Sequence, residues 1–311
     1  MQLVAYGAQD IYLTGNPQIT FFKVVYRRHT NFSMEAIIQT FNGTVGTGQS
    51  TLTATISRNG DLVSNLWLDV GLDITTLQDG DGDYANWTNN TGHAFVKECE
   101  IEIGGQRIDR HYSQWLDVYN ELTDHEESEW IGLNKHAAKN SYLKSGPASS
   151  GGEVTRLYVP LKFWFCRNPG LALPLIALQY HEVKLKLTTR GLAGLVNVKG
   201  SVTLPSNAPS CDLYADYIYL DTDERRRFAQ VSHEYLIEQV QRESGTMSNS
   251  QTLNFNHPIK ELIWTVQASK AATEGAGAGS DGIDATFNDQ TQAATNFENN
   301  DYFNYSPGSS G

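Results

Sequence analysis

Residues 66–72 read LWLDVGL, and this stretch gives the clearest single indication of the fold class. Its aliphatic side chains occupy every second position, at Leu66, Leu68, Val70 and Leu72. Successive side chains of a β-strand point to opposite faces of a sheet, so this spacing places all four on one face. A strand with one such apolar face is typical of an antiparallel sheet that packs on a single core.

The same period of two recurs along the chain. It predicts further strands at residues 52–56, 95–103, 157–165, 183–187, 213–220, 235–240 and 262–266. Turn-forming pairs such as Asn42-Gly43 and Gly104-Gly105 separate these runs. Many short strands joined by such turns indicate an all-β sandwich or barrel rather than an α/β fold.

One segment has helical spacing instead. Tyr112, Trp115, Leu116, Tyr119 and Leu122 recur three or four residues apart, which is the pattern of an amphipathic helix. We therefore expect one short helix, on an excursion between two strands of the sandwich.

The composition limits the class of protein further. The chain has 311 residues, of which 40% are hydrophobic and 19% charged, enough apolar mass for a buried core. Twenty-three basic residues against 35 acidic ones give a net charge of −12. Nucleic-acid binding needs a dense positive surface, so we expect no direct nucleic-acid partner. We also expect no secretory signal and no transmembrane segment, because the sequence lacks the apolar runs that these require.

Three short motifs imitate known binding sites, and each lacks a residue that the chemistry needs. Residues 43–50 (GTVGTGQS) resemble a phosphate-binding loop, but Gln49 replaces the lysine that contacts the phosphates. Residues 79–83 (DGDGD) imitate the start of a calcium loop whose bidentate glutamate is missing. Residues 233–238 (HEYLIE) lack the second histidine of a zinc-protease helix. We therefore expect no catalytic residue, no cofactor, no metal ion and no enzymatic activity.

The cysteines give no sign of a cross-linked or metal-bound scaffold. Cys99, Cys166 and Cys211 are odd in number and widely separated, and no CxxC pair occurs. This argues against a zinc ribbon or a disulfide-rich fold. We expect three buried, reduced thiols.

Six blocks of sequence follow one another along the first 264 residues. They read LVAYGAQDIYLTGNPQITFFKVVYRRHTNF (residues 3–32), SRNGDL (57–62), EIEIGGQRIDRHY (100–112), PGLALPLIALQYHEVKLKL (169–187), DYIYLDTDERRRFAQVSHEYLIEQ (216–239) and LNFNHPIKELIW (253–264). Together these blocks resemble the major capsid proteins of nucleocytoplasmic large DNA viruses, and the chlorovirus and mimivirus-like branch is nearest. Six blocks in one order are far more specific than any single short motif.

The resemblance implies a viral double jelly roll, in which two eight-stranded antiparallel sandwiches stand in tandem. It implies an N-terminal arm over residues 1–32, a first jelly roll over residues 33–220, and a linker with the beginning of a second jelly roll over residues 221–311. The implied function is structural, as a homotrimer that forms pseudo-hexagonal capsomers of an icosahedral virion. The implied partners are copies of the chain, neighbouring capsomers and minor capsid proteins, with synthesis and assembly in the host cytoplasm.

The length after residue 220 departs from the family pattern. Residues 221–311 are about half as many as the first sandwich occupies, and after Lys270 the chain contains neither lysine nor arginine. This acidic stretch, rich in Gly and Asn, has no strand pattern and is predicted to be an insertion. We therefore expect a C-terminally partial chain whose second jelly roll is incomplete.

Several of these expectations have alternatives. Arg225-Arg226-Arg227 would make either local ion pairs in a link between domains or a contact to a neighbouring subunit. The apolar residues 11–26 would either run beneath the sandwich toward neighbouring proteins or form a first strand of it. Jelly rolls also serve as lectins. The alternative function is therefore a carbohydrate-binding or attachment protein, with Trp87, Trp130 and Tyr142 as candidate stacking residues.

Overall fold

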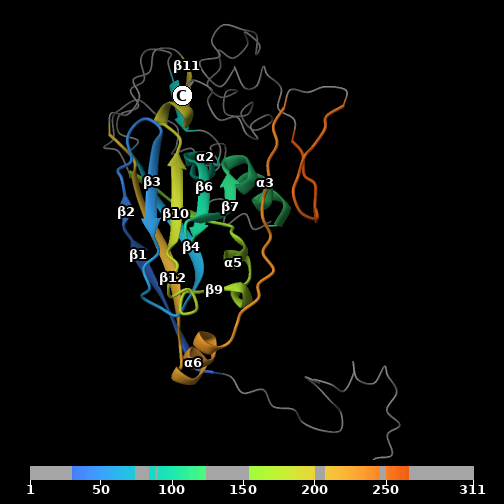
Figure 1. The fold of residues 1–311 in the computed structure, drawn as a ribbon. Helices are drawn as coiled ribbons and strands as arrows, with labels where there is room; N and C mark the ends of the chain where they lie inside the picture. The colour runs from blue at the N-terminus through green and yellow to red at the C-terminus, as the bar shows by residue number, and fades with distance from the viewer. Residues whose placement is uncertain are drawn as a thin grey trace, which may run out of the picture.

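Two antiparallel β-sheets stack face to face and form the body of the molecule (Figure 1). The computed structural model describes residues 30–73, 84–87, 90–123, 154–199, 207–245 and 250–265. Sheet 1 contains, in order, β1 (Phe32–Gln39), β12 (Ser210–Leu220), β4 (Leu62–Asp73) and β8 (Val154–Pro160), with β9 (Leu173–Pro174) beside the start of β4. Sheet 2 contains, in order, β2 (Phe41–Asn42), β3 (Ser50–Thr55), β10 (Val183–Thr189), β6 (Val96–Ile103) and β7 (Gln106–Tyr112).

The path of the chain between the sheets is that of a jelly roll. From β3 in sheet 2 the chain crosses to β4 in sheet 1, returns for β6 and β7, and crosses again to β8. It then returns to sheet 2 for β10 and to sheet 1 for β12. There β12 lies between β1 and β4 and pairs with both. Four strands of each sheet thus form an eight-stranded jelly roll. The predicted all-β jelly-roll sandwich is confirmed.

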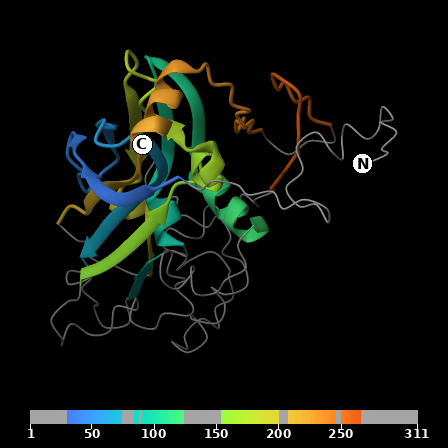
Figure 2. The ribbon, with the colours of Figure 1, turned by 90° about the horizontal axis from the view of Figure 1, so that it is seen from below.

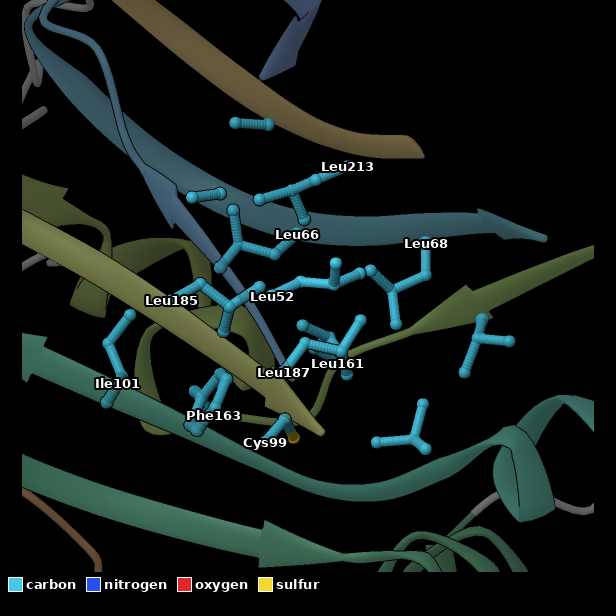
Figure 3. Packing of buried hydrophobic residues seen from close by; sticks show 14 of the residues in the cluster. Leu52, Leu66, Leu68, Cys99, Ile101, Leu161, Phe163, Leu185, Leu187 and Leu213 are labelled. Carbon is cyan, nitrogen blue, oxygen red and sulfur yellow. The ribbon is translucent and has the colours of Figure 1, made fainter. Parts of the chain in front are cut away.

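The LWLDVGL stretch lies in β4, with β12 on one side and β8 on the other. Leu66, Leu68, Val70 and Leu72 are each at most 1% exposed. Figure 3 shows Leu66 and Leu68 in the packed layer between the sheets, together with leucines of sheet 2 such as Leu185. Because a fully buried leucine contributes about 1.5–3 kcal/mol, these rows supply the main driving force for stacking the two sheets.

A bulge in sheet 2 keeps its apolar residues facing the core. Thr188 of β10 pairs with Glu98 of β6, but the next residue, Thr189, pairs with Val96. The extra residue in β6 reverses the alternation, so Val96 and Cys99 both point inward although they are three positions apart. A strict period of two would have turned one of them toward solvent.

Short helices connect the strands. The predicted helix is confirmed as α3 (Ser113–Thr123), which directly follows β7 and buries Leu116. The helix α6 (Thr222–Gln230) follows β12, and the Asp221 side chain caps it by accepting a hydrogen bond from the Thr222 N–H. The remaining short elements are α2 (Thr91–Phe95), α5 (Trp164–Arg167), the 3₁₀ turns η2 (Pro169–Leu171) and η3 (Leu192–Gly194), and the paired strands β5 (Tyr84–Trp87) and β11 (Val196–Lys199).

The strand predicted at residues 157–165 is wrong in its second half. β8 ends at Pro160, which has no N–H to donate to a ladder, and α5 occupies residues 164–167. Phe163 and Phe165 are nevertheless fully buried, and their rings stack with centroids 6.0 Å apart. Apolar residues therefore keep alternating in the sequence after β8 ends, because the turn into α5 places the rings of Phe163 and Phe165 in the core.

The two strands predicted after α6 are also wrong. Residues 235–240 and 262–265 belong to no sheet, and residue 266 lies outside the described residues. Alternation shows which side chains can be buried, whereas a strand also needs a backbone partner. Residues 235–240 instead contact β7 through side chains: the Val240 N–H donates to Asp109 Oδ1 at 3.0 Å, and Gln239 Nε2 donates to the Ile108 carbonyl. The predicted arm segment 11–26 and the acidic insertion lie outside the described residues.

Removing one core leucine tests this packing. Leu185→Ala empties a site that is 0% exposed between the sheets, and we expect the free energy of unfolding to fall by about 2–5 kcal/mol. Lys184→Ala changes the neighbouring residue on the outer face, whose solvent-exposed ion pair with Glu182 should contribute little to stability. Urea unfolding followed by tryptophan fluorescence measures both. Equal losses in the two variants would contradict the assignment of faces.

Candidate assembly surface

Paired charges line the outer face of sheet 2. Strand register places Lys186, Glu100 and Arg110 in one row across β10, β6 and β7. Glu100 contacts both Arg110 and Arg107, and Lys186 contacts Glu102 in the adjacent row. Exposed pairs of this kind add little stability. They do make the face costly to bury, because desolvating the charges would be unfavourable.

The outer face of sheet 1 carries apolar side chains instead. In β1, Phe32, Met34 and Ile38 are 66%, 54% and 51% exposed. The register pairs Met34 with Ile218 and Ile38 with Tyr214 across β12. Tyr214 pairs in turn with Trp67 of β4. The outward-pointing, exposed or half-buried residues of this set are called the apolar face: Phe32, Met34, Ile38, Trp67, Tyr214 and Ile218.

The apolar face lies at an edge of sheet 1, where another protein chain could also contact the backbone of β1. β1 pairs with β12 alone among the described strands, so its other edge presents unpaired backbone groups. Trp67 is held in place because its indole N–H donates to Asp216 Oδ2 at 3.1 Å. Contiguous exposed apolar side chains beside a free strand edge mark a protein–protein contact. This combination is the strongest candidate for an assembly surface in the described part of the chain.

The opposite edge of the sandwich is covered by residues 231–245, called the strap, which run from α6 past α5 toward α3 (Figures 1 and 2). The Val240 N–H donates to the buried Asp109 carboxylate of β7 at 3.0 Å. Arg167, the last residue of α5, pairs with Glu238 at 3.0 Å. The strap therefore lies on the β7–β8 side, and among the described residues it leaves the apolar face uncovered.

Two buried His–Asp pairs were missed by the sequence analysis. His93 Nδ1 of α2 lies 2.5 Å from Asp117 Oδ1 of α3, and the two side chains are 1% and 3% exposed. His111 Nε2 lies 2.8 Å from Asp109 Oδ2 in β7, and the His111 ring stacks on Phe163 at 4.6 Å. Such pairs occur in active sites, but both of these are buried: His93–Asp117 joins α2 to α3, and Asp109–His111 lies within β7. The Asp-x-His spacing in β7 was a usable signal, since it puts both side chains on one face.

The motifs that imitate binding sites do not form them. Residues 43–49 make the loop between β2 and β3, and β3 begins at Ser50, where a phosphate site would need a helix N-terminus. His233 Nε2 donates to the Phe228 carbonyl at 2.7 Å, and Glu238 is engaged by the strap ion pairs. Residues 79–83 lie outside the described residues.

The described ranges hold neither a metal cluster nor a membrane span. Across them, no three His, Cys, Asp or Glu side chains come together in a way that could hold a metal ion. Within the same ranges, none of the helices has the length and apolar character that crossing a bilayer requires. Of the residues proposed for sugar stacking, Trp87 is the last residue of β5, and Trp130 and Tyr142 lie outside the described residues.

All three cysteines are free thiols. Cys99 is buried as predicted, but Cys166 and Cys211 are only half-buried residues, which corrects the expectation for those two. Desolvation raises the pKa of the Cys166 and Cys211 thiols to about 12, and burial raises the pKa of Cys99 as well. The thiols therefore stay protonated at neutral pH and are poor nucleophiles.

The basic run in α6 is divided between two environments. Arg225 Nε lies 2.9 Å from Asp61 Oδ1, and Asp61 Oδ2 also accepts a hydrogen bond from the Leu220 N–H at 2.8 Å. Arg225 thus makes an ion pair within its own chain, but with Asp61 of the sandwich rather than with the acidic residues that flank the basic run. Arg226 and Arg227 are exposed on α6.

Comparison with known proteins identifies the family. A family model described as "Major capsid protein N-terminus" matches residues 20–221, and one described as "Large eukaryotic DNA virus major capsid protein" matches residues 224–307. The chain belongs to the major capsid proteins of large eukaryotic DNA viruses. The resemblance seen in the sequence is confirmed, and membership of this family agrees with a structural rather than an enzymatic role.

Individual members of the family are similar over most of the chain. The major capsid protein of Pyramimonas orientalis virus is 54% identical, over 86% of this chain and 65% of the relative. That of Phaeocystis pouchetii virus is 49% identical, over 86% of this chain and 58% of the relative. A solved structure titled "PBCV-1 virus capsid, quasi-atomic model" is 42% identical with a TM-score of 0.55, over 71% of this chain and 50% of that one. The chain thus spans about three fifths of the length of the capsid proteins it matches.

A titration tests the seat of the strap. Ion pairs with Lys260 and Arg167 lower the pKa of Glu238 below its ordinary value of 4.5. Their contribution is therefore complete above that ordinary value and is lost as the pH falls through the lowered pKa of the folded state. An NMR titration of the Glu238 carboxylate should give a midpoint below 4.5.

Two variants provide the controls for this titration. Lys260→Met should raise the Glu238 midpoint toward 4.5, because it removes the group that lowers the pKa most. Lys184→Met breaks a different exposed pair, that with Glu182, and should leave the Glu238 midpoint unchanged. A midpoint that does not respond to Lys260→Met would contradict the described contacts of the strap.

Proposed function

We propose that this protein is a structural subunit of the icosahedral shell of a large DNA virus, and that copies of it associate through the apolar face. Three copies form a homotrimer, and the trimer is the pseudo-hexagonal building block of the shell. The observation that carries the proposal is the contrast between the two outer faces in a member of a capsid family. Sheet 2 presents charges to solvent, whereas sheet 1 presents Phe32, Met34 and Ile38.

A second copy is the occupant that best fits the apolar face. The strap leads the chain after α6 to the β7–β8 side, away from β1. Large permanent interfaces are more apolar than ordinary protein surface, and an aromatic and aliphatic centre with a polar rim is their usual composition. Repeating shells need such contacts between identical chains, since a closed symmetric assembly reuses the same patches in every subunit.

The domain division is part of the same proposal. Residues 1–32 are an arm, residues 33–220 a first jelly roll, and residues 221–311 a linker with the beginning of a second. The separate family match over residues 224–307 supports this boundary. Neighbouring capsomers and minor capsid proteins are the further partners, and the host cytoplasm is the place of assembly. Minor proteins would contact the ends of the sandwich, where loops are free to vary.

A charge in the apolar face tests the proposal. Met34→Asp places a carboxylate at the centre of the exposed row and should abolish self-association, while it changes stability by less than about 0.5 kcal/mol. Sedimentation velocity of the full chain over a range of concentrations measures the oligomer. The wild type should reach a species of three times the monomer mass, and Met34→Asp should remain monomeric.

A matched substitution separates a specific contact from general stickiness. Leu122→Asp introduces the same change at a 59% exposed position of α3, outside the apolar face, and should trimerise like the wild type. The proposal fails if the wild type is monomeric at every concentration. It also fails if Met34→Asp trimerises as well as Leu122→Asp does.

A further inference from the structure

An apolar groove of about 390 Å³ lies at the α6 end of the sandwich, between the strap and the residues that follow α5. Trp164, Leu171 and Leu178 line one side, and Phe228 of α6 lines the other. The Phe228 ring is held in place by stacking on His233 at 5.1 Å, and His233 Nε2 also donates to the Phe228 carbonyl. Water in contact with such walls is unfavourable, so the groove favours an apolar occupant.

The first described residue, Thr30, stands close to this groove. Its Oγ1 donates to Glu224 Oε1 at 3.4 Å. Glu224 and Phe228 are four residues apart and therefore lie on the same side of α6, about one helical turn or 5.4 Å along its axis. Four extended residues span about 13 Å. The chain that precedes Thr30 can therefore enter the groove from Tyr26 backward.

The sequence before Thr30 is complementary to the groove and to its rim. Residues 21–26 read FFKVVY, in which five of the six side chains are apolar or aromatic. Arg27 and Arg28 come next, and the first turn of α6 carries Asp223 and Glu224. Opposite charges at the mouth of an apolar site fix the direction in which a segment enters it.

We infer that residues 21–26 occupy the groove of their own chain, with Arg27 and Arg28 beside Asp223 and Glu224. The segment then joins the residues before β1 to α6 and to the strap, which begin the C-terminal part of the chain. A short tether makes this intrachain contact favourable, because the effective concentration of a segment held a few residues away is high. The docking requires only one chain and is independent of self-association through the apolar face.

Limited trypsin digestion of the full chain tests this contact, because Lys23 lies inside the segment. Trypsin cuts only the population in which the segment has left the groove. Leu178→Asp places a charge in the groove and should speed cleavage after Lys23 about tenfold. Leu122→Asp makes the same change on α3 and should cleave at the wild-type rate. The monomer fraction from size-exclusion chromatography is digested, and mass spectrometry follows the products.

A charge exchange provides a second test that leaves the groove walls intact. The double variant Asp223→Lys/Glu224→Lys should speed cleavage after Lys23, and adding Arg27→Glu and Arg28→Glu should restore slow cleavage. Equal rates in the wild type and Leu178→Asp, or a charge exchange that restores nothing, would overturn the inference. Protection that grows with protein concentration would also overturn it, because it would assign the groove to a second copy. Failure to trimerise leaves the expected rates unchanged.

Discussion

Each sheet of the sandwich must give one whole face to the other, and the rest of the structure depends on this constraint. Leu68 of β4 and Leu185 of β10 both lie fully buried in the layer between the sheets, so every second residue of the strands is committed to the core. The residues between them point away from the core and are free of this packing constraint. They are therefore the positions at which two sheets of the same fold can present different surfaces.

The two outer faces use that freedom in opposite ways. In sheet 2, Glu100 sits in a row with Lys186 and Arg110, and the charges satisfy one another across three strands. In sheet 1, the corresponding rows hold Met34 beside Ile218 and Ile38 beside Tyr214. One face is stable in water and costly to cover, whereas the other is stabilised by being covered. A subunit with this asymmetry has a defined side toward which its neighbours can pack.

The period of two was sufficient for strands that pair with other described strands. It found β4 and β10, and helical spacing found α3, because in each case one face is buried. It failed at residues 157–165, where the turn into α5 buries Phe165 just as a strand would, and at residues 235–240, where side-chain contacts with β7 replace a ladder. The apolar face could not be assigned, because Phe32, Met34 and Ile38 alternate as core residues do, and alternation alone cannot tell a row that packs in the core from one that faces outward. The His93–Asp117 pair, 24 positions apart, has no local signal at all.

The pairing of β1 with β12 also determines how late in translation the first strand can find its partner. Phe32 is matched with Leu220, so the first strand of sheet 1 has no neighbour until almost the whole sandwich has been translated. At about 5–20 residues per second, the interval between making the two strands is roughly 10 to 40 s. Until β12 follows, Phe32, Met34 and Ile38 lie on a strand that lacks this pairing partner. Exposed apolar residues on an unpaired strand favour aggregation, so this interval is the stage of synthesis at which the chain is most prone to it.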